Sequence, residues 1–509
     1  MTREMTMAYV LGTSPAAAAF LVAFRFAYLL RRLFGEGALV NGFIPHYEAL
    51  KSQDEKRASF FFRDLFYSIS LLLIGVIGVL EFVLCFVIHR FALQESNLEI
   101  LRLIMLSLPG LLFICLFALH TGFLQCQGRF FLTGAAPVVF NLAWIGSLLF
   151  YRNEEASAIT SHLAVALDVA FLLQWVILLP ATWKKLKGLL TFYDFKAFKL
   201  FSQEIRSLLM TLSLSVIGVS AIQINGFIDV LFARAADLQG PAYLTFAIRL
   251  QQLPLALFGI AISSAIFPSL SRACENRDEL AAEGLLRFGL MRSSCLMIPC
   301  TFGILILGAP AINLLFGHGH FTNHSTFYTT LCLWAYGVGL LPSTVLLLFS
   351  QAFFARHDFK TPMLLSLGTI ALNALLNSLL IYGLHWGAVS VAVATSFTSA
   401  INAVLLYLLY KKRYEMTFFS EKWRPLLQLF SSTVIATLAC LLTSFWVGDN
   451  SFLEMLQGKF PSFPRNLSGQ ALQLVLPSLV FAVIFVLTSW ITRCEEVLNL
   501  LRIKSRSFY

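Results

Sequence analysis

Long apolar segments recur along the chain and are separated by short polar joints. A helix crosses the roughly 30 Å hydrocarbon core of a bilayer in about 20 residues, so segments of this length indicate membrane spans. The joints are too short to hold a soluble domain. The pattern therefore predicts an all-α polytopic membrane protein with thirteen full spans, at about 15–45, 59–90, 98–127, 130–151, 157–182, 203–233, 240–270, 285–309, 325–354, 361–383, 387–410, 425–447 and 469–492.

The segment Met1 to Gly12 is apolar but short. Twelve helical residues extend about 18 Å, well below the thickness of the hydrocarbon core. We interpret this segment as the second half of a fourteenth helix. Either translation begins upstream of Met1, which we favour, or the first helix is truncated and its neighbours cover the gap. The fold prediction is thus about fourteen transmembrane helices, of which the first is shortened.

Composition agrees with a membrane location. Hydrophobic residues make up 58% of the chain and charged residues 13%, with a mean hydropathy of +0.77, whereas soluble domains carry about 25% charge. The net charge of +10 does not indicate nucleic-acid binding, because the basic residues are spread over the joints.

The basic residues are distributed unequally between the two sides of the membrane. The joints on one side hold twenty-four Lys and Arg residues. The joints on the other side hold five, Arg90, Arg152, Arg234, Lys459 and Arg465. This bias predicts cytoplasmic N- and C-termini.

Four charged residues, Arg25, Arg31, Arg32 and Glu36, interrupt the first apolar span. Each costs about 2.5 to 3.5 kcal/mol near a bilayer centre, so the group must face a polar cavity, a partner or the interface. Helical spacing places Arg25, Arg32 and Glu36 on one face and Arg31 about 100° away. We expect Arg32 to pair with Glu36 and Arg31 to face a cavity. Arg31 lies near the middle of a helix that runs from 16 to 45, whereas a helix that ends near residue 35 would place it at the interface.

Further polar residues lie inside other spans. Arg249 is either a cavity residue or a side chain that extends to the outer interface, and Asp229 either belongs to a site or neutralises an arginine of a neighbouring helix. We interpret Asp168 as a contact between helices.

Sequence patterns of enzymes are absent. There is no GxxxxGK[ST] motif for ATP, no HExxH motif and no Ser/His/Asp grouping, so the sequence argues against an enzyme. The loop GHGHFTNH contains His318, His320 and His324, but neither a carboxylate nor a cysteine accompanies them, and we predict no metal and no cofactor.

Five segments in order along the chain resemble motifs of the MurJ (MviN) lipid II flippase family. The first, AFLVAFRFAYLLRRLFGEGAL, is similar to the family pattern AFxxAFxxPxLLRRxFxEGAF. The others are GRFFLTGAAPVVFN (128–141), IQINGFIDVLFA (222–233) with AIRLQQLPLALFGIAISSAIFPSLS (247–271), LLFGHGHFT (314–322) and ARHDFKTP (355–362).

The resemblance implies two pseudo-symmetric six-helix lobes with a cavity between them, followed by a helix pair that forms a groove for a lipid tail. The lobes would be residues 1–183 and 203–413, joined by a cytoplasmic linker at 184–202, with the helix pair and tail at 414–509. Arg3, Arg31 and Arg249 match the family's functional arginines. Ile248 and Gln252 stand at positions that are acidic in the family.

The implied function is transport of lipid II, the undecaprenyl-pyrophosphate-linked peptidoglycan precursor, across the bacterial inner membrane by alternating access. Arginines would bind the diphosphate, and membrane potential or an ion gradient would drive transport. Lipid II, membrane lipids and cell-wall synthesis proteins are the expected partners, and nucleic acid is not. The alternatives are an exporter of another polyprenyl-linked oligosaccharide or of a drug and, from a different class, a non-transporting membrane scaffold.

Overall fold

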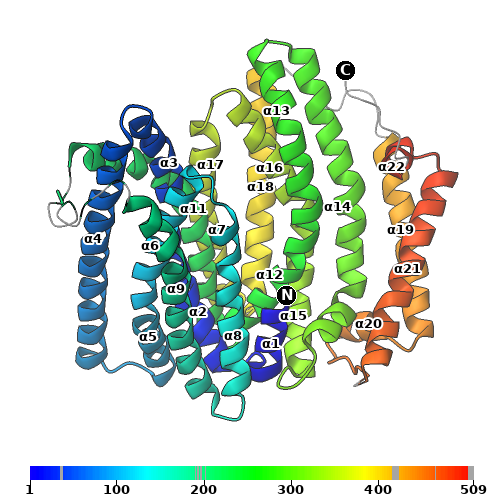
Figure 1. Ribbon diagram of the computed structural model, residues 1–509. Helices are drawn as coiled ribbons and strands as arrows, with labels where there is room; N and C mark the ends of the chain where they lie inside the picture. Colours follow the sequence, from blue (N-terminus) through cyan, green and yellow to red (C-terminus); the bar gives the residue numbers. More distant parts are fainter. Residues whose placement is uncertain are drawn as a thin grey trace. The chain divides into compact units, whose positions relative to one another are not determined.

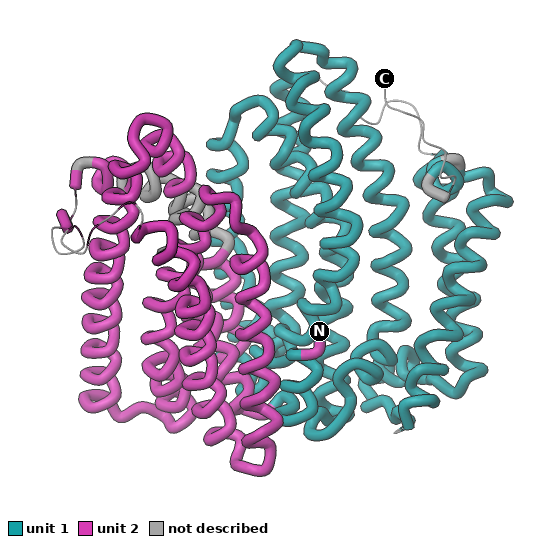
Figure 2. The backbone as a smooth tube through the Cα atoms, in the orientation of Figure 1, with its two compact units in different colours: residues 1, 3–13, 235–509 teal, residues 2, 14–234 magenta. Residues whose placement is uncertain are grey.

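The computed structural model describes residues 1–34, 38–187, 189, 191, 194, 198–200, 202–414, 424–464 and 466–501. In this part of the chain all regular elements are helices (Figure 1). The chain divides into two compact units, drawn in separate colours in Figure 2. Unit 1 comprises residues 1, 3–13 and 235–509, and unit 2 comprises residues 2 and 14–234. The all-α prediction is confirmed, whereas the predicted lobe boundaries remain a prediction.

Unit 2 is built from helices that follow one another directly in the sequence. They are α2 (Pro15–Phe34), α3 (Ala38–Lys51), α4 (Glu55–Arg90), α5 (Glu95–Ser107), α6 (Pro109–Cys126), α7 (Phe131–Ala135), α8 (Pro137–Phe150), α9 (Ala156–Leu186) and α11 (Gln203–Ala236), whose last two residues belong to unit 1.

Unit 1 combines one helix from the start of the chain with all helices that follow residue 235. They are α1 (Thr2–Leu11), α12 (Gly240–Pro254), η1 (Leu255–Ile260), α13 (Ala261–Glu275), α14 (Glu279–Phe316), α15 (Asn323–Val338), α16 (Leu340–Ala355), α17 (Lys360–Ser378), η2 (Leu379–Gly383), α18 (Val389–Tyr414), α19 (Arg424–Trp446), α20 (Ser451–Leu456), α21 (Leu467–Ile491) and α22 (Glu495–Leu501).

The predicted spans coincide with these helices to within a few residues. Among the described residues, ten helical stretches are long and apolar enough to cross a membrane, or eleven if α15 and α16, bent by 42°, form one span. The protein is therefore a multi-pass membrane protein. The predicted spans at 15–45 and 203–233 are helical as α2 with α3 and as α11. The total of fourteen remains a prediction.

Prolines lie at several helix ends. Pro109 and Pro137 begin α6 and α8, where the missing backbone donor costs nothing because the first helical N–H groups have no partner. Pro254 ends α12 and is followed by the π-helical turn η1. Proline removes a backbone hydrogen bond in mid-helix, and such wide turns commonly accompany the resulting distortion.

A cation-centred cluster ties together three helices of unit 1. Arg356, directly after α16, donates from Nε to the Tyr410 hydroxyl of α18 at 2.9 Å and from both terminal nitrogens to Glu279, the first residue of α14. Its guanidinium carbon lies 3.8 Å from the centre of the Tyr414 ring. The fork of Arg356 thus satisfies a carboxylate and a phenol while its face stacks on an aromatic ring.

Replacing Arg356 should measurably destabilise unit 1. We expect Arg356→Ala to lower the free energy of unfolding by about 2 to 3 kcal/mol, because charge-assisted hydrogen bonds and a cation–π contact are lost together. The free energy of unfolding of Arg356→Lys should lie between those of the parent protein and Arg356→Ala, since lysine keeps the charge and loses the planar fork. Melting curves of the detergent-solubilised variants test this order, and an unchanged midpoint for Arg356→Ala would contradict it.

Candidate functional site

Two of the predicted site arginines meet at one carboxylate in unit 1. Arg3 of α1 donates to Glu4 Oε1 at 2.6 Å, and the Nε of Arg249, on α12, lies 3.1 Å from the same oxygen. The Glu4 side chain is 11% exposed, that of Arg3 19% and that of Arg249 37%. Glu4 therefore holds two like charges together, and the Arg249 guanidinium remains accessible.

The arrangement suits an anion with several oxygens. Glu4 faces more than one cationic group, and the outer guanidinium, that of Arg249, presents planar donors. Guanidinium groups bind phosphate and carboxylate oxygens through two parallel hydrogen bonds, which a single point charge cannot do. Gln252, one turn further along α12, is 3.5 Å from Arg249. It adds an exposed amide at the same edge.

Sequence reasoning missed Glu4 as a site residue. The positions beside Arg249 that are acidic in the resembled family carry Ile248 and Gln252 here, and Glu4 provides a carboxylate from another helix. An acidic residue next to an arginine in a short apolar segment was the available signal, because such a pair in a membrane protein requires mutual compensation.

Loop 317–325 holds the end of α1. The His320 backbone N–H donates to the Tyr9 carbonyl at 3.0 Å. Gly12 adopts a φ of 57°, and a Cβ there would run into the His320 carbonyl. Thr13 Oγ1 lies 2.7 Å from Ser325 Oγ. The position of Arg3 and Glu4 thus depends on contacts made more than 300 residues away in sequence.

The histidines of this loop have separate contacts. The His318 ring is 3.1 Å from the Leu314 carbonyl, and the His324 ring is 3.3 Å from the Tyr243 hydroxyl. Within the described residues, no three side chains of the His, Cys, Asp and Glu types gather as a metal site would require.

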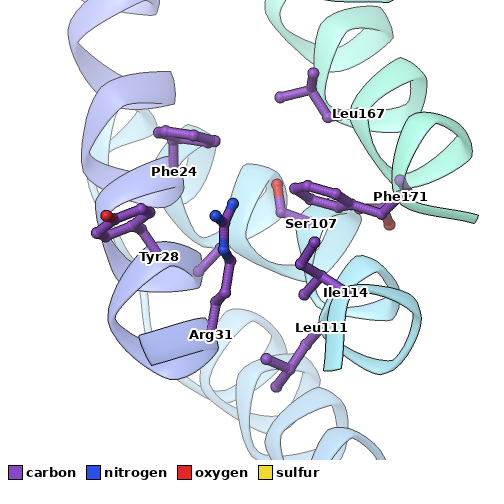
Figure 3. A pocket seen from close by; sticks show the side chains of 10 residues that line it. Phe24, Tyr28, Arg31, Ser107, Leu111, Ile114, Leu167 and Phe171 are labelled. Atoms are coloured by element: carbon purple, nitrogen blue, oxygen red, sulfur yellow. The ribbon is translucent and has the colours of Figure 1, made fainter. Parts of the chain in front are cut away.

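The third predicted arginine, Arg31, points into a cavity within unit 2 (Figure 3). The cavity is lined from α2, α5, α6 and α9, and its polar lining residues are Tyr28, Arg31, Ser107 and Asp168. Its volume of about 20 Å³ suffices for a water molecule and is far too small for a diphosphate. Asp168 of α9 lies against Gly110 of α6, in agreement with its interpretation as a contact between helices. Asp168 also lines the Arg31 cavity, and sequence reasoning missed this second position.

Tyr28 organises the arginines of α2. Arg32 donates to its hydroxyl from Nε at 3.0 Å and from a terminal nitrogen at 2.8 Å. The guanidinium carbons of Arg31 and Arg25 lie 5.3 and 5.9 Å from the ring centre. Glu36, the predicted partner of Arg32, lies outside the described residues.

Of the remaining candidates in unit 2, Arg25 packs against α11 and Asp229 belongs to α11. The Arg25 guanidinium occupies the space that a side chain at Gly226 would need, so the missing Cβ makes room for it. Asp229 is buried and accepts a hydrogen bond from Asn225 at 3.3 Å. That Arg25 and Asp229 contribute to a substrate-binding site stays a prediction.

Comparisons with known proteins point to one family. A family model described as "Lipid II flippase MurJ" matches residues 7–461. The chain is similar to the probable lipid II flippase MurJ of Chlamydia muridarum, at 32% identity over 89% of this chain and 82% of the relative. A probable MurJ from Chlamydia pneumoniae is 29% identical over 98% of this chain and 90% of the relative.

Two solved structures share the fold. A lipid II flippase MurJ in an inward closed conformation matches with a TM-score of 0.74 and 22% identity, over 98% of this chain and 96% of that one. An inward-facing multidrug resistance MATE family transporter of the MOP superfamily matches with a TM-score of 0.66 and 15% identity, over 81% of this chain and 93% of that one.

Proposed function

The chain belongs to the lipid II flippase MurJ family, and we propose from this membership that it moves lipid II between the leaflets of the bacterial inner membrane. The observation that carries the proposal is the Arg3–Glu4–Arg249 cluster, which gathers phosphate-binding groups from α1 and α12. The protein is then a transporter rather than an enzyme, and its substrate leaves chemically unchanged.

The chemistry of the substrate explains why arginines are needed. A diphosphate joined to a sugar–peptide head cannot enter hydrocarbon without compensation of its charge, while the polyprenyl tail can stay in the membrane. We propose that Arg249 and Arg3 bind the diphosphate oxygens, which then replace one Glu4 oxygen as the ligand of Arg249. Arg31 is proposed as a further substrate-binding residue, reached after its cavity widens.

The tail has an apolar place to lie in unit 1. A cavity of about 580 Å³ is lined by residues of α14, α16, α18 and α19, among them Ile298, Val345, Val404 and Phe430. This cavity reaches α19, the first helix of the pair that the family resemblance assigns to the tail. We propose that the polyprenyl chain occupies it and continues along α19 and α21.

Energy for transport is proposed to come from the membrane potential or an ion gradient, because the chain has no ATP-binding motif. Alternating access by movement of one unit against the other would carry the headgroup across, as in other transporters built from repeats. Cell-wall synthesis proteins are proposed as partners that supply or consume the lipid.

Orientation follows from the basic joints, and we propose that both termini are cytoplasmic. In a cysteine-free background, single cysteines at Asn450 and Asn323 should react with a membrane-impermeant thiol reagent in intact cells, and one at Ser52 should react only after permeabilisation. Labelling at Ser52 in intact cells would reverse the proposed topology.

Transport of the substrate itself tests the proposed function. Vesicles that contain the purified protein and fluorescent lipid II should expose the label on the opposite leaflet faster than protein-free vesicles, and expression of the chain should replace a depleted native flippase. A drug exporter would instead move a cationic dye and leave lipid II in place. A membrane scaffold would move neither compound.

A further inference from the structure

A continuous set of contacts joins the ends of α1, α12 and α15. We call it the terminal junction and define it by Thr13, Gln239, Tyr243, His324 and Phe460. The Gln239 side-chain oxygen accepts from Thr13 Oγ1 at 3.1 Å and from the Tyr243 hydroxyl at 2.7 Å. The same hydroxyl lies 3.3 Å from His324 Nδ1. Both acceptor positions of the amide oxygen are therefore used, which fixes its orientation.

The terminal junction also reaches the connection between α20 and α21. The His324 ring stacks on Phe460 with ring centres 5.4 Å apart and an angle of 30° between the planes. Phe460 also contacts Phe327, and the centres of these two rings lie 4.9 Å apart. Phe460 is 54% exposed and His324 is also exposed, so this stack lies at the protein surface.

Both parts of the arginine cluster depend on this junction. Thr13 follows α1 and so fixes the helix that carries Arg3 and Glu4. Tyr243 precedes Arg249 by six residues on α12, about 9 Å along the helix axis. His324 links these helices directly to the loop before α21, because its ring contacts both the Tyr243 hydroxyl and the Phe460 ring. The rings of Tyr328 and Phe327 form a second, longer path between the same two residues.

We propose, on the basis of the proposed function, that His324 is a positioning residue that sets the separation between the diphosphate-binding arginines and the tail-binding helices α19 and α21. A substrate with both a diphosphate and a long tail then engages two sites at a fixed spacing. Binding of one part raises the effective concentration of the other only when the spacing matches. The junction thus selects long-tailed polyprenyl diphosphates over short ones.

The test compares two ligands on the purified full-length protein in detergent. Undecaprenyl diphosphate is the long-tailed ligand, and farnesyl diphosphate is the short-tailed one. His324→Ala should weaken binding of undecaprenyl diphosphate about fivefold and leave farnesyl diphosphate unchanged. Phe460→Ala should also weaken binding of the long-tailed ligand, and the double variant should lose less than the sum of the two single losses, since both remove the His324–Phe460 contact. His324→Phe keeps the stack on Phe460 and loses the contact with the Tyr243 hydroxyl, so it should restore only part of the preference for the long tail.

His318→Ala is the matched control, because that ring lies in the same loop and contacts the Leu314 carbonyl. It should bind both ligands as the parent does. The positioning role would be overturned if His324→Ala left the ratio of the two affinities unchanged, either by weakening binding of both ligands equally or by weakening neither. Arg249→Ala should weaken both ligands together, and a failure to do so would overturn the proposed diphosphate site and this inference with it.

Discussion

Arg249→Ala should abolish transport of lipid II while the protein still folds and inserts. The substitution removes the more accessible guanidinium of the cluster, and loss of charge-assisted hydrogen bonds to an anion costs about 1.5 to 3 kcal/mol, a 10- to 100-fold loss in affinity. Folding should survive because Glu4 keeps Arg3 as a partner at 2.6 Å. Lipid II movement in vesicles and protein yield are the two measurements.

Arg249→Lys separates charge from geometry. Lysine keeps the positive charge and loses the planar fork, so we expect it to restore only a small part of the transport rate. Arg152→Ala, at an exposed arginine of a joint in unit 2, is the control and should transport normally. Transport at the parent rate by Arg249→Ala would exclude this residue from the site.

Gly12→Ala should cause the second large loss. The new Cβ would run into the His320 carbonyl, whose atoms belong to the backbone and cannot rotate away as a side chain would. The added strain is about 1 to 3 kcal/mol, in addition to about 1 to 2 kcal/mol for a side chain at positive φ. Because α1 must move to relieve the clash, Arg3 and Glu4 move with it, and transport should fall at least about tenfold.

Gly128 offers a matched comparison. Its φ of 72° is also positive, but a Cβ there would meet nothing within 4 Å. Gly128→Ala should therefore show only the conformational cost, with a small decrease in melting temperature and normal transport. If both variants behave alike, the contact between Gly12 and His320 is not what positions α1.

The membrane spans were predictable because the transfer of each helix into hydrocarbon depends on its own side chains. Arg249 could be singled out for the same reason, since a charge in an apolar segment is costly unless it faces a partner or a polar cavity. Which helices pair is a different matter. The contact of Thr13 with Ser325 spans 312 residues and depends on two hydroxyl groups and one positive φ nearby, which hydropathy does not record.

The site was predicted only in part for a related reason. Sequence reasoning gave Arg3 and Arg249 as separate candidates, but the carboxylate between them, Glu4, became visible only when α1 and α12 were seen to meet. Likewise, Asp168 matched a helix contact by its position and was found beside Arg31 as well. A polar residue in a span reveals that it needs a partner, and the tertiary fold decides which one.

The contacts between α1 and residues 317–325 also constrain the order in which the helices can pack during synthesis. The ribosome makes α1 before the helices that it contacts, and Ser325, the partner of Thr13, is added 312 residues after Thr13. At about 5 to 20 residues per second, this delay is roughly 15 to 60 s. α1 therefore cannot complete its contacts with this segment until the helices from α2 to α14 have been made. A nascent chain arrested before residue 320 should leave α1 open to cleavage by an added protease.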